Sequence, residues 1–265
     1  MKRLVLGGLL TACVLVLPSC LGDGGSNTRT LSNIPGVVRF DLKSMKTLVD
    51  AAEALPLGLY SPDVEARGFD NGDCVLISFS VDFNSAENVN AQTTGYLNIA
   101  LSSILPVDQF PCDAHMRDTS VLLDNKTEQA ISYAIDSYLG YRLVNDKLFL
   151  FSDIDQLTDQ KNNWILYYDP KLEAEKDGQG KRIYSLFLRA QIRVEGTKPN
   201  NPYAVPNAFN AGYFFEQVNA KELSAGSKIA YIKINHINKI TRTEQDTTFT
   251  WTSSELIPIN VVEDN

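Results

Sequence analysis

Cysteine and histidine are the residues of this chain best suited to nucleophilic or metal chemistry, and both are scarce. The chain has four cysteines and two histidines. Cys112 stands three residues before His115, but a zinc site needs two more ligands, and His236 lies in an apolar run typical of a strand. We therefore expect no metal and no cofactor. Cys74 and Cys112 could form a disulfide bond or remain buried free thiols, and the sequence leaves both alternatives open.

Carboxylates give the next candidate site. Asp153, Asp155 and Asp159 place three carboxylates within seven residues, and oxygen ligands suit calcium. The glycine and the terminal glutamate of an EF-hand loop are missing, so we expect a solvated acidic turn. The chain also has no Gly-x-Ser-x-Gly, Walker A, Gly-x-Gly-x-x-Gly or His-Glu-x-x-His motif. The sequence therefore predicts a protein that is not an enzyme. One alternative stays open, a glycosidase-like hydrolase that uses a pair of the 32 acidic side chains.

Four aromatic residues could contact a carbohydrate ligand, because an aromatic ring stacks on the apolar face of a sugar. They are Trp164, Tyr167, Tyr203 and Trp251. Packing in a core or a hairpin is the alternative for each of them. Tyr203 lies in a Pro- and Asn-rich stretch from Gly196 to Asn207, which we expect to form a long exposed loop between strands.

The N-terminus has the form of an export signal. Two basic residues precede an apolar run at residues 4–17, which is too short to span a bilayer comfortably. The run Leu17-Pro18-Ser19-Cys20 resembles the lipobox of bacterial lipoproteins, in which the signal is cut before the cysteine and the cysteine is acylated. We therefore expect a signal peptide at residues 1–19 and a membrane anchor formed by lipid on Cys20. Simple secretion is the alternative.

The charge balance is acidic, and it argues against an electrostatic nucleic-acid interface. The full chain has 24 basic and 32 acidic residues, a net charge of -8. Removal of residues 1–19 takes away Lys2 and Arg3 and leaves 22 basic against 32 acidic residues, a net charge of -10. Nucleic-acid binding needs a clustered basic face, which this composition does not favour. With 44% hydrophobic residues, the chain is apolar enough to bury a core.

Hydrophobic periodicity predicts the elements of the first half of the chain. Odd-numbered positions in the stretch 74–83 are large and apolar, while most of the residues between them are polar, which predicts a strand with one buried face. Further strands are predicted at residues 37–42 and 95–101, and the second of these is expected to pair with the stretch 74–83. The apolar residues between Met45 and Ala52 follow helical spacing and predict a short helix.

The second half of the chain is predicted to be mostly strand. Apolar residues from Ile131 to Leu139 follow helical spacing, with Gly140 placed to end the element, so we expect a helix at residues 127–139. A hairpin with its turn at Asn145-Asp146 should follow. The predicted strands are 142–144, 147–151, 164–168, 182–194, 213–215, 228–234 and 249–259. Many short strands separated by Gly, Pro and Asn turns favour a β-sandwich.

Four features together resemble the NigD-like lipoproteins of the Bacteroidetes. They are the lipobox, the strand opening Gly36-Val37-Val38, the entry Gly72-Asp73-Cys74 and the late pattern from Gly226 to Ile234. The resemblance implies a mainly β fold with an OB-like N-terminal barrel and a C-terminal β-sandwich, and it brings no catalytic residues. The expected divisions are a signal peptide at 1–19, a lipid-anchored flexible tether at 20–35, an OB-like domain at 36–112 and a β-sandwich at 113–265, with one short helix between the domains.

These features predict a non-enzymatic, lipid-anchored protein of the cell envelope that acts as a binding or assembly component. Its expected partners are the membrane and either a carbohydrate or a protein, and no nucleic acid. The hydrolase above is one alternative. The other is a subunit of a fimbrial or other surface assembly, whose strands pair with a neighbour. We expect the chain at the outer membrane, on its periplasmic or its surface face.

Overall fold

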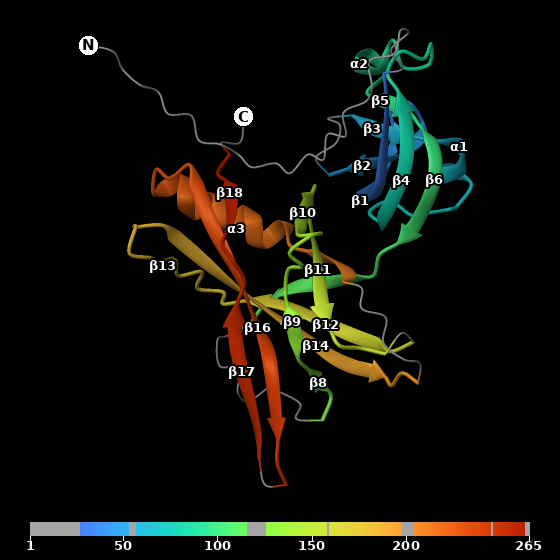
Figure 1. The fold of residues 1–265 in the computed structure, drawn as a ribbon. Helices are drawn as coiled ribbons and strands as arrows, with labels where there is room; N and C mark the ends of the chain where they lie inside the picture. The colour runs from blue at the N-terminus through green and yellow to red at the C-terminus, as the bar shows by residue number, and fades with distance from the viewer. Residues whose placement is uncertain are drawn as a thin grey trace.

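The computed structural model describes residues 27–52, 57–115, 126–157, 159–197, 204–244 and 246–262, which form two successive β domains (Figure 1). The first is built on a six-stranded sheet and the second on a twelve-stranded sheet. The described helices are α1 (Pro62–Glu65), α2 (Ala91–Thr94) and α3 (Gly212–Ser224). The predicted mainly β fold class is confirmed.

The six-stranded sheet of the first domain has the strand order β5-β3-β2-β1-β4-β6. Its strands are β1 (Thr28–Asp41), β2 (Lys46–Ala51), β3 (Gly58–Tyr60), β4 (Cys74–Asp82), β5 (Tyr96–Asn98) and β6 (Ala100–Pro106). β1 pairs antiparallel with both β2 and β4, while β5 pairs in parallel with β3. Because β1 begins at Thr28, residues 28–35 belong to a strand where the sequence predicted a flexible tether.

The alternation at residues 74–83 is confirmed as the central strand β4. Val75, Ile77 and Phe79 are fully buried and form the core of the first domain. The strand predicted at 37–42 lies in β1, except for its last residue. The strand predicted at 95–101 is divided in two. Its end, in β6, pairs with β4 as expected, while its beginning, in β5, pairs with β3 instead.

The helix predicted between Met45 and Ala52 is wrong, because this segment forms β2. Val49 pairs with Val38 on β1, and both side chains are buried in the core. The preceding turn is closed by the Asp41 carboxylate, which accepts a hydrogen bond from the Ser44 amide at 2.9 Å, and Met45 has a positive φ of 57°. In so short a segment, pairing with a buried neighbouring strand outweighs helical spacing.

The main path of the twelve-stranded sheet runs β10-β11-β15-β7-β12-β14-β16-β17, with β13, β18, β8 and β9 attached at its sides. These strands are β7 (Gln109–Ala114), β8 (Glu128–Gln129), β9 (Ile131–Tyr133), β10 (Tyr141–Val144), β11 (Lys147–Ile154), β12 (Lys161–Tyr168), β13 (Glu175–Lys176), β14 (Arg182–Val194), β15 (Val205–Asn210), β16 (Ile229–Arg242), β17 (Thr247–Ser253) and β18 (Ile257–Asn260). The hairpin with its turn at Asn145-Asp146 is confirmed as β10 and β11. The strand predictions within β12, β14 and β16 are also confirmed.

The helix predicted at residues 127–139 is wrong. The segment forms β8, β9 and a turn, in which the Asp136 carboxylate accepts hydrogen bonds from the amides of Tyr138 and Leu139 at 2.8 and 2.7 Å. This local bonding offers the backbone an alternative to a helix. The apolar spacing was misleading because Ile131 is buried while Tyr138 is 90% exposed.

Two further predictions near the C-terminus need correction. Residues 213–215, predicted as a strand, begin α3, which buries Phe214, Val218 and Glu222 at intervals of four residues. The strand prediction used only the aromatic residues 213–215. The helical period of 3.6 residues becomes visible only when the residues that follow them are included. The single strand predicted at 249–259 is two strands, β17 and β18, which pair with different parts of β16.

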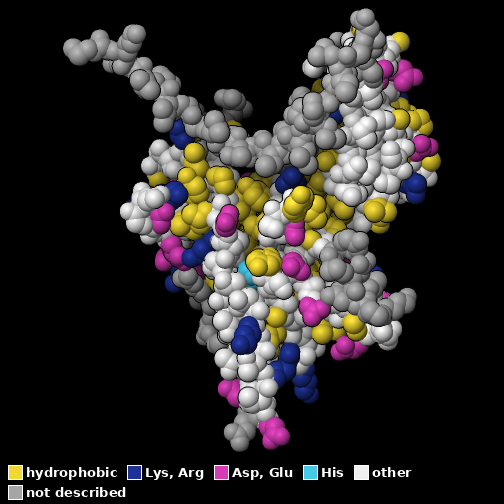
Figure 2. Space-filling model, viewed as in Figure 1, with side chains coloured by type: hydrophobic (Ala, Val, Ile, Leu, Met, Phe, Trp, Pro, Cys, Tyr) yellow, Lys and Arg dark blue, Asp and Glu magenta, His cyan; other side chains and the backbone are white. Residues whose placement is uncertain are grey.

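The two domains meet through a shared apolar core. Val37, Cys74 and Leu76 of the first domain pack in one cluster with Phe149 and Phe151 of the second. Figure 2 shows hydrophobic side chains gathered where the domains meet and over α3, whereas the projecting β16–β17 hairpin carries polar and charged ones. The first sheet ends at β6 and the second begins at β7, so the boundary predicted between residues 112 and 113 falls within a strand of the second sheet.

Candidate ligand-binding site

β7 changes its neighbour half-way along its length, and this change opens the second sheet. Its first three residues pair in parallel with β15, from Gln109 opposite Ala208 onward. Its last three pair in parallel with β12, from Cys112 opposite Leu166 onward. The part of β12 before Leu166 and the part of β15 before Ala208 therefore flank the beginning of β7 without pairing with it.

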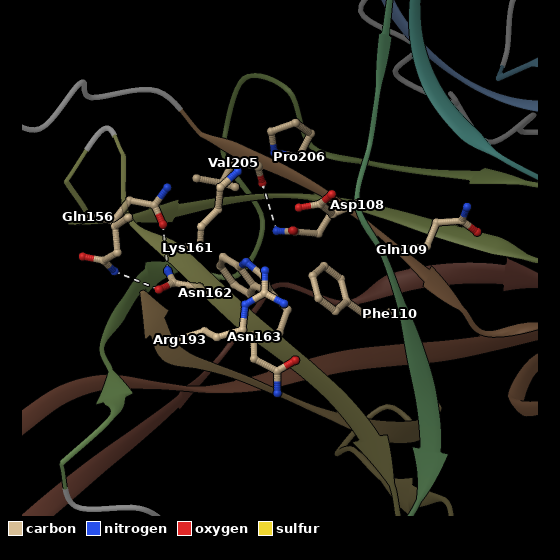
Figure 3. Close-up of a pocket in the computed structure, with 13 residues that line it drawn as sticks. Asp108, Gln109, Phe110, Gln156, Lys161, Asn162, Asn163, Arg193, Val205 and Pro206 are labelled. Carbon is tan, nitrogen blue, oxygen red and sulfur yellow. Dashed lines mark hydrogen bonds between the residues drawn. The ribbon is translucent and has the colours of Figure 1, made fainter. Parts of the chain in front are cut away.

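A cavity of about 400 Å³ occupies this opening (Figure 3). Its lining consists of Asp108, Gln109, Phe110, Gln156, Gln160, Lys161, Asn162, Asn163, Trp164, Arg193, Val205, Pro206 and Asn207. We call this cavity the slot. Because alternate residues of a strand point to opposite faces, lining by runs of consecutive residues places the slot at strand edges rather than on one face of the sheet. Its volume is in the range of cavities that hold small ligands.

Side-chain amides form a connected group in the slot. Gln160 Nε2 donates hydrogen bonds to Asn162 Oδ1 at 2.8 Å and to Gln129 Oε1 at 2.6 Å. Asn162 Nδ2 donates in turn to Gln156 Oε1 at 2.7 Å. Since each amide carries two N–H donors and an oxygen with two lone pairs, these bonds orient the amides without using their full capacity. The slot can therefore donate hydrogen bonds to a ligand and accept them from it.

Two cations and one anion contribute charge to the slot. Lys161 and Arg193 are exposed, and neither forms an ion pair with a described residue. Arg193 lies at a β-bulge, since Val194 pairs with Lys161 while Ile192 pairs with Asn162, the next residue. A bulge redirects a side chain, and in Figure 3 the side chains of Arg193, Phe110 and Asp108 lie around the same space. Asp108 is the single acidic residue of the lining.

Two aromatic residues form the apolar part of the slot. Phe110 is half-buried, with its ring centroid 6.0 Å from that of Phe209 in the domain core. Trp164 is 3% exposed and belongs to the same core. Of the four aromatic candidates, Trp164 is thus the one that the structure brings to the slot, and it is also a packing residue.

The other aromatic candidates lie elsewhere. Tyr167 stacks on Phe187 at a centroid distance of 5.1 Å, and Phe187 meets Trp251 edge-on at 6.0 Å, an arrangement that corresponds to the packing alternative. Tyr203 lies outside the described residues. Of the loop predicted at 196–207, residues 205–207 begin β15 instead, and Asn207 is buried.

The structure keeps Cys74 and Cys112 apart, as free thiols. Cys74 lies in the core between the domains, while Cys112 packs against the core of the second domain, so the disulfide alternative is not formed. Burial raises the pKa of each thiol to about 12, which leaves both protonated and unreactive at neutral pH. Cys20, the predicted lipidation site, lies outside the described residues.

The aspartates at 153–159 do not gather around one point. Asp153 lies in β11, whereas Asp159 accepts hydrogen bonds from the amide of Thr197 at 2.8 Å and from its hydroxyl at 2.9 Å. Among the described residues, no three His, Cys, Asp or Glu side chains are close enough to hold a metal ion. None of the described helices has the length and apolar character needed to cross a bilayer.

Charged groups in the core of the second domain differ from those of the slot, because they are paired. The buried Glu222 carboxylate accepts hydrogen bonds from Tyr184 Oη and Arg182 Nε, both at 2.6 Å. Burial raises the pKa of Glu222, but these bonds outweigh that effect and lower it. The buried Glu128 is likewise paired with Arg189 and Gln191. Through these bonds Glu222 connects α3 to β14, and Glu128 connects β8 to β14.

Sequence reasoning missed most residues of the slot. The polar run Gln160-Lys161-Asn162-Asn163 directly before the predicted strand 164–168 was the available signal, and it was not used. The alternation predicted for residues 182–194 also placed Arg193 on the polar side of its strand. Nothing local to Asp108 or Asn207 indicates that they lie near these residues, because the pairing of β7 brings them together.

Residues 25–104 match a protein-family model described as a lipoprotein OB domain. The first domain is OB-like. This match confirms the predicted OB-like N-terminal domain and relates the chain to lipoproteins of the Bacteroidetes. It covers the first domain only, so the second domain is compared through solved structures.

Two solved structures extend the likeness over both domains. An uncharacterized protein from Parabacteroides merdae is 29% identical, with a TM-score of 0.70 over 88% of this chain and 100% of its own length. A candidate lipoprotein from Bacteroides fragilis has a TM-score of 0.54 over 85% of this chain and 97% of its own. At 10% identity, the second likeness shows the fold alone. No curated protein matches the chain.

Proposed function

We propose that this chain is a non-enzymatic lipoprotein of the cell envelope that binds a ligand in the slot. The slot itself carries the proposal. It is an opening between two strand edges, lined by amide and charged side chains, in a domain that follows a lipoprotein OB domain. Backbone groups at an interrupted ladder need hydrogen-bond partners, and a bound ligand can supply them.

The composition of the slot favours binding over catalysis. A glycosidase mechanism needs two carboxylates, and the described lining contains one, on Asp108. The same lining contains no histidine, cysteine or serine, so it offers no nucleophile paired with a general base. We therefore prefer a binding function for this chain over the alternative function of an envelope hydrolase.

The envelope location rests on the N-terminal sequence together with the family match. The lipobox ending at Cys20 provides an acylation site, and the first domain matches a lipoprotein OB domain. Because β1 begins at Thr28, only a few residues after Cys20, a lipid on Cys20 would hold the OB-like domain close to the membrane. We assign the chain to the outer membrane and, as the finer relationship, to the NigD-like lipoproteins.

Fatty-acid labelling in cells tests the anchor. The wild-type chain should incorporate an alkyne-tagged palmitate and sediment with membranes, whereas Cys20→Ala should lose the label and leave the membrane fraction. Cys13→Ala is the matched control, because this cysteine lies in the same leader but outside the lipobox, and it should behave as wild type. Equal labelling of Cys20→Ala and wild type would overturn the anchor.

Turnover assays test the non-enzymatic assignment. The full chain, purified in detergent, should leave a panel of glycosides, peptides and esters unchanged. Asp108→Asn removes the carboxylate of the slot and should make no difference to this result. Turnover by wild type that disappears in Asp108→Asn would show that the slot is an active site and would replace the binding function by a hydrolase.

A further inference from the structure

We propose that the ligand of the slot is a saccharide that carries carboxylate groups, such as an oligomer of uronic acid or a sialylated oligosaccharide. This inference rests on the proposed function, because it names the class of ligand for the same slot. Three properties of the lining carry it: two cations that form no ion pair with a described residue, a group of amides that can both donate and accept hydrogen bonds, and an aromatic ring beside them.

The lining of the slot carries more positive than negative charge, although the chain as a whole is acidic. The chain has a net charge of -8, yet Lys161 and Arg193 face a lining with a single acidic residue. Several other cations are paired with carboxylates: Arg39 with Asp50, Arg182 with Glu222, Arg189 with Glu128, and Lys233 with Glu175. The two cations of the slot form no ion pair with a described residue, which leaves them available for an anionic ligand. Arginine in particular matches the planar geometry of a carboxylate.

The amides of the slot match the hydroxyl groups of a sugar. Each hydroxyl both donates and accepts a hydrogen bond, and a side-chain amide offers both functions in one plane. Gln156, Gln160 and Asn162 are held in place by their mutual hydrogen bonds, so less conformational entropy is lost when a ligand binds. Asn163 and Asp108 are exposed at the slot and add a further amide and a carboxylate acceptor.

An apolar surface completes the match. The ring of Phe110 is partly exposed at the slot and rests against Phe209, which fixes its position. Sugars present C–H groups on one face of the ring, and an aromatic side chain can pack against that face. A free inorganic anion could bind to the two cations, but it would not need the amides or the ring of Phe110.

A peptide strand is the competing ligand, since the slot lies at strand edges. The residues at those edges work against it. Pro206 has no N–H to donate to an added strand, and Lys161 at the start of β12 is of the type that protects exposed edges from strand pairing. These features favour a saccharide.

Binding to matched ligands tests the inference on the full chain in detergent. Trp251→Phe leaves Trp164 as the single tryptophan of the chain, so its fluorescence reports on the slot. The ligands are tetragalacturonate and its neutral counterpart tetragalactose, sialyllactose and its neutral counterpart lactose, and tetraglutamate as an acidic peptide. Titration calorimetry measures each dissociation constant in parallel. The substitutions Lys161→Gln and Arg193→Gln remove charge from the slot, while Lys239→Gln removes it from an exposed position outside the lining.

At least one carboxylated saccharide should bind about tenfold more tightly than its neutral counterpart. Lys161→Gln and Arg193→Gln should each weaken that binding by about tenfold and leave binding of the neutral counterpart nearly unchanged, whereas Lys239→Gln should change neither. The preference should also decline as salt is raised. This pattern, together with a change in Trp164 fluorescence, would support the inference.

Three results would overturn it, and they separate it from the proposed function. If charged and neutral saccharides bind equally well, the ligand need not carry a carboxylate and the inference is wrong. The proposed function, ligand binding in the slot, would still stand. Tighter binding of tetraglutamate than of any saccharide, weakened by the same two substitutions, identifies an acidic-peptide site and again keeps the binding function. No binding of any panel member contradicts both the inference and the ligand-binding part of the proposed function.

Discussion

One strand in each domain, β4 in the first and β7 in the second, pairs with its two neighbours in a different way. This difference explains where the slot lies. In the first domain, the central strand β4 pairs with β1 on one side and with β6 on the other along nearly its whole length. In the second domain, β7 pairs with β15 over its first half and with β12 over its second half. A continuous ladder satisfies its own backbone groups, whereas a strand that changes partners leaves edges to be satisfied by something else. The slot that we propose as a ligand-binding site lies in this interrupted sheet.

The two domains are held together by the apolar core that they share. Cys74 and Leu76, at the start of β4, pack against Phe149 and Phe151 of β11, and Asn145 donates a hydrogen bond to the Asp50 carboxylate at 3.2 Å. A buried contact of this kind gives the two sheets a fixed orientation. We therefore expect the OB-like domain to act as a rigid support for the second domain, which contains the slot.

The most widespread effect is expected from Phe149→Ala, which removes a fully buried ring from the core that both domains share. The loss of a buried phenylalanine costs about 3–5 kcal/mol of unfolding free energy. Because its cluster contains residues of both domains, hydrogen exchange should speed up in β4 as well as in β11 and β15. Mass spectrometry of peptides from each strand measures this directly.

Phe79→Ala is the matched control, since Phe79 is also fully buried but belongs to the core of the first domain alone. It should lower protection in β1 and β4 and leave β14 close to wild type. If Phe149→Ala left β4 unchanged, the two domains would be independent folding units and the rigid support would be refuted.

Strands with a regular buried face could be predicted from the sequence, and the reason is local. In β14, the residues from Arg182 to Val194 were predicted with both ends correct, because the apolar side chains alternate along the whole strand. The predicted helix at 127–139 failed because its apolar residues imitate helical spacing while Asp136 binds the backbone of its own turn. Hydrophobic periodicity is thus sufficient to predict a long strand. It does not predict a turn that is formed by hydrogen bonds from a polar side chain to the nearby backbone.

The candidate site was less accessible to prediction than the fold. Trp164 was singled out for its ring chemistry and does line the slot. Asp108, Lys161 and Arg193 were not singled out. Asp108 lies in the link before β7, while Lys161 and Arg193 lie on β12 and β14, and these segments meet only through the pairing of β7 and the bulge at Arg193. A site built by non-local pairing leaves no pattern within any one segment of the sequence.

A smaller effect, confined to the second domain, is expected from acid. Both histidines lie in that domain, and burial lowers the pKa of His236 below its ordinary value of 6.5, against the opposing effect of the backbone at Ile234 and Ser132. The unfolded chain therefore binds the proton first as pH falls. Stability from this group is complete above pH 6.5 and is lost as pH falls toward the lower folded-state pKa, with a slope of at most about 1.4 kcal/mol per pH unit.

Urea unfolding followed by tryptophan fluorescence between pH 7.5 and 5.5 measures this loss, because both tryptophans lie in the second domain. His236→Phe removes the titrating group and should flatten the pH dependence over this range. His115→Phe is the control, because it removes an exposed histidine of the same domain and leaves His236 in place. An unchanged slope in His236→Phe would assign the acid sensitivity to other groups.

The smallest effect on stability is expected from Arg193→Gln in the slot. A comparison with Arg189→Gln distinguishes a residue proposed to bind ligand from one that stabilises the fold. Arg189 and Arg193 lie on the same strand, but the side chain of Arg189 is 6% exposed and paired with the buried Glu128, while Arg193 is exposed and forms no ion pair with a described residue. Arg189→Gln should lower the unfolding free energy by about 3–5 kcal/mol, because it leaves a buried carboxylate without its countercharge. Arg193→Gln should change it by less than about 0.5 kcal/mol. If urea unfolding showed a large loss for Arg193→Gln, this arginine would be part of the structural framework, and its role in ligand binding would have to be inferred from another residue of the slot.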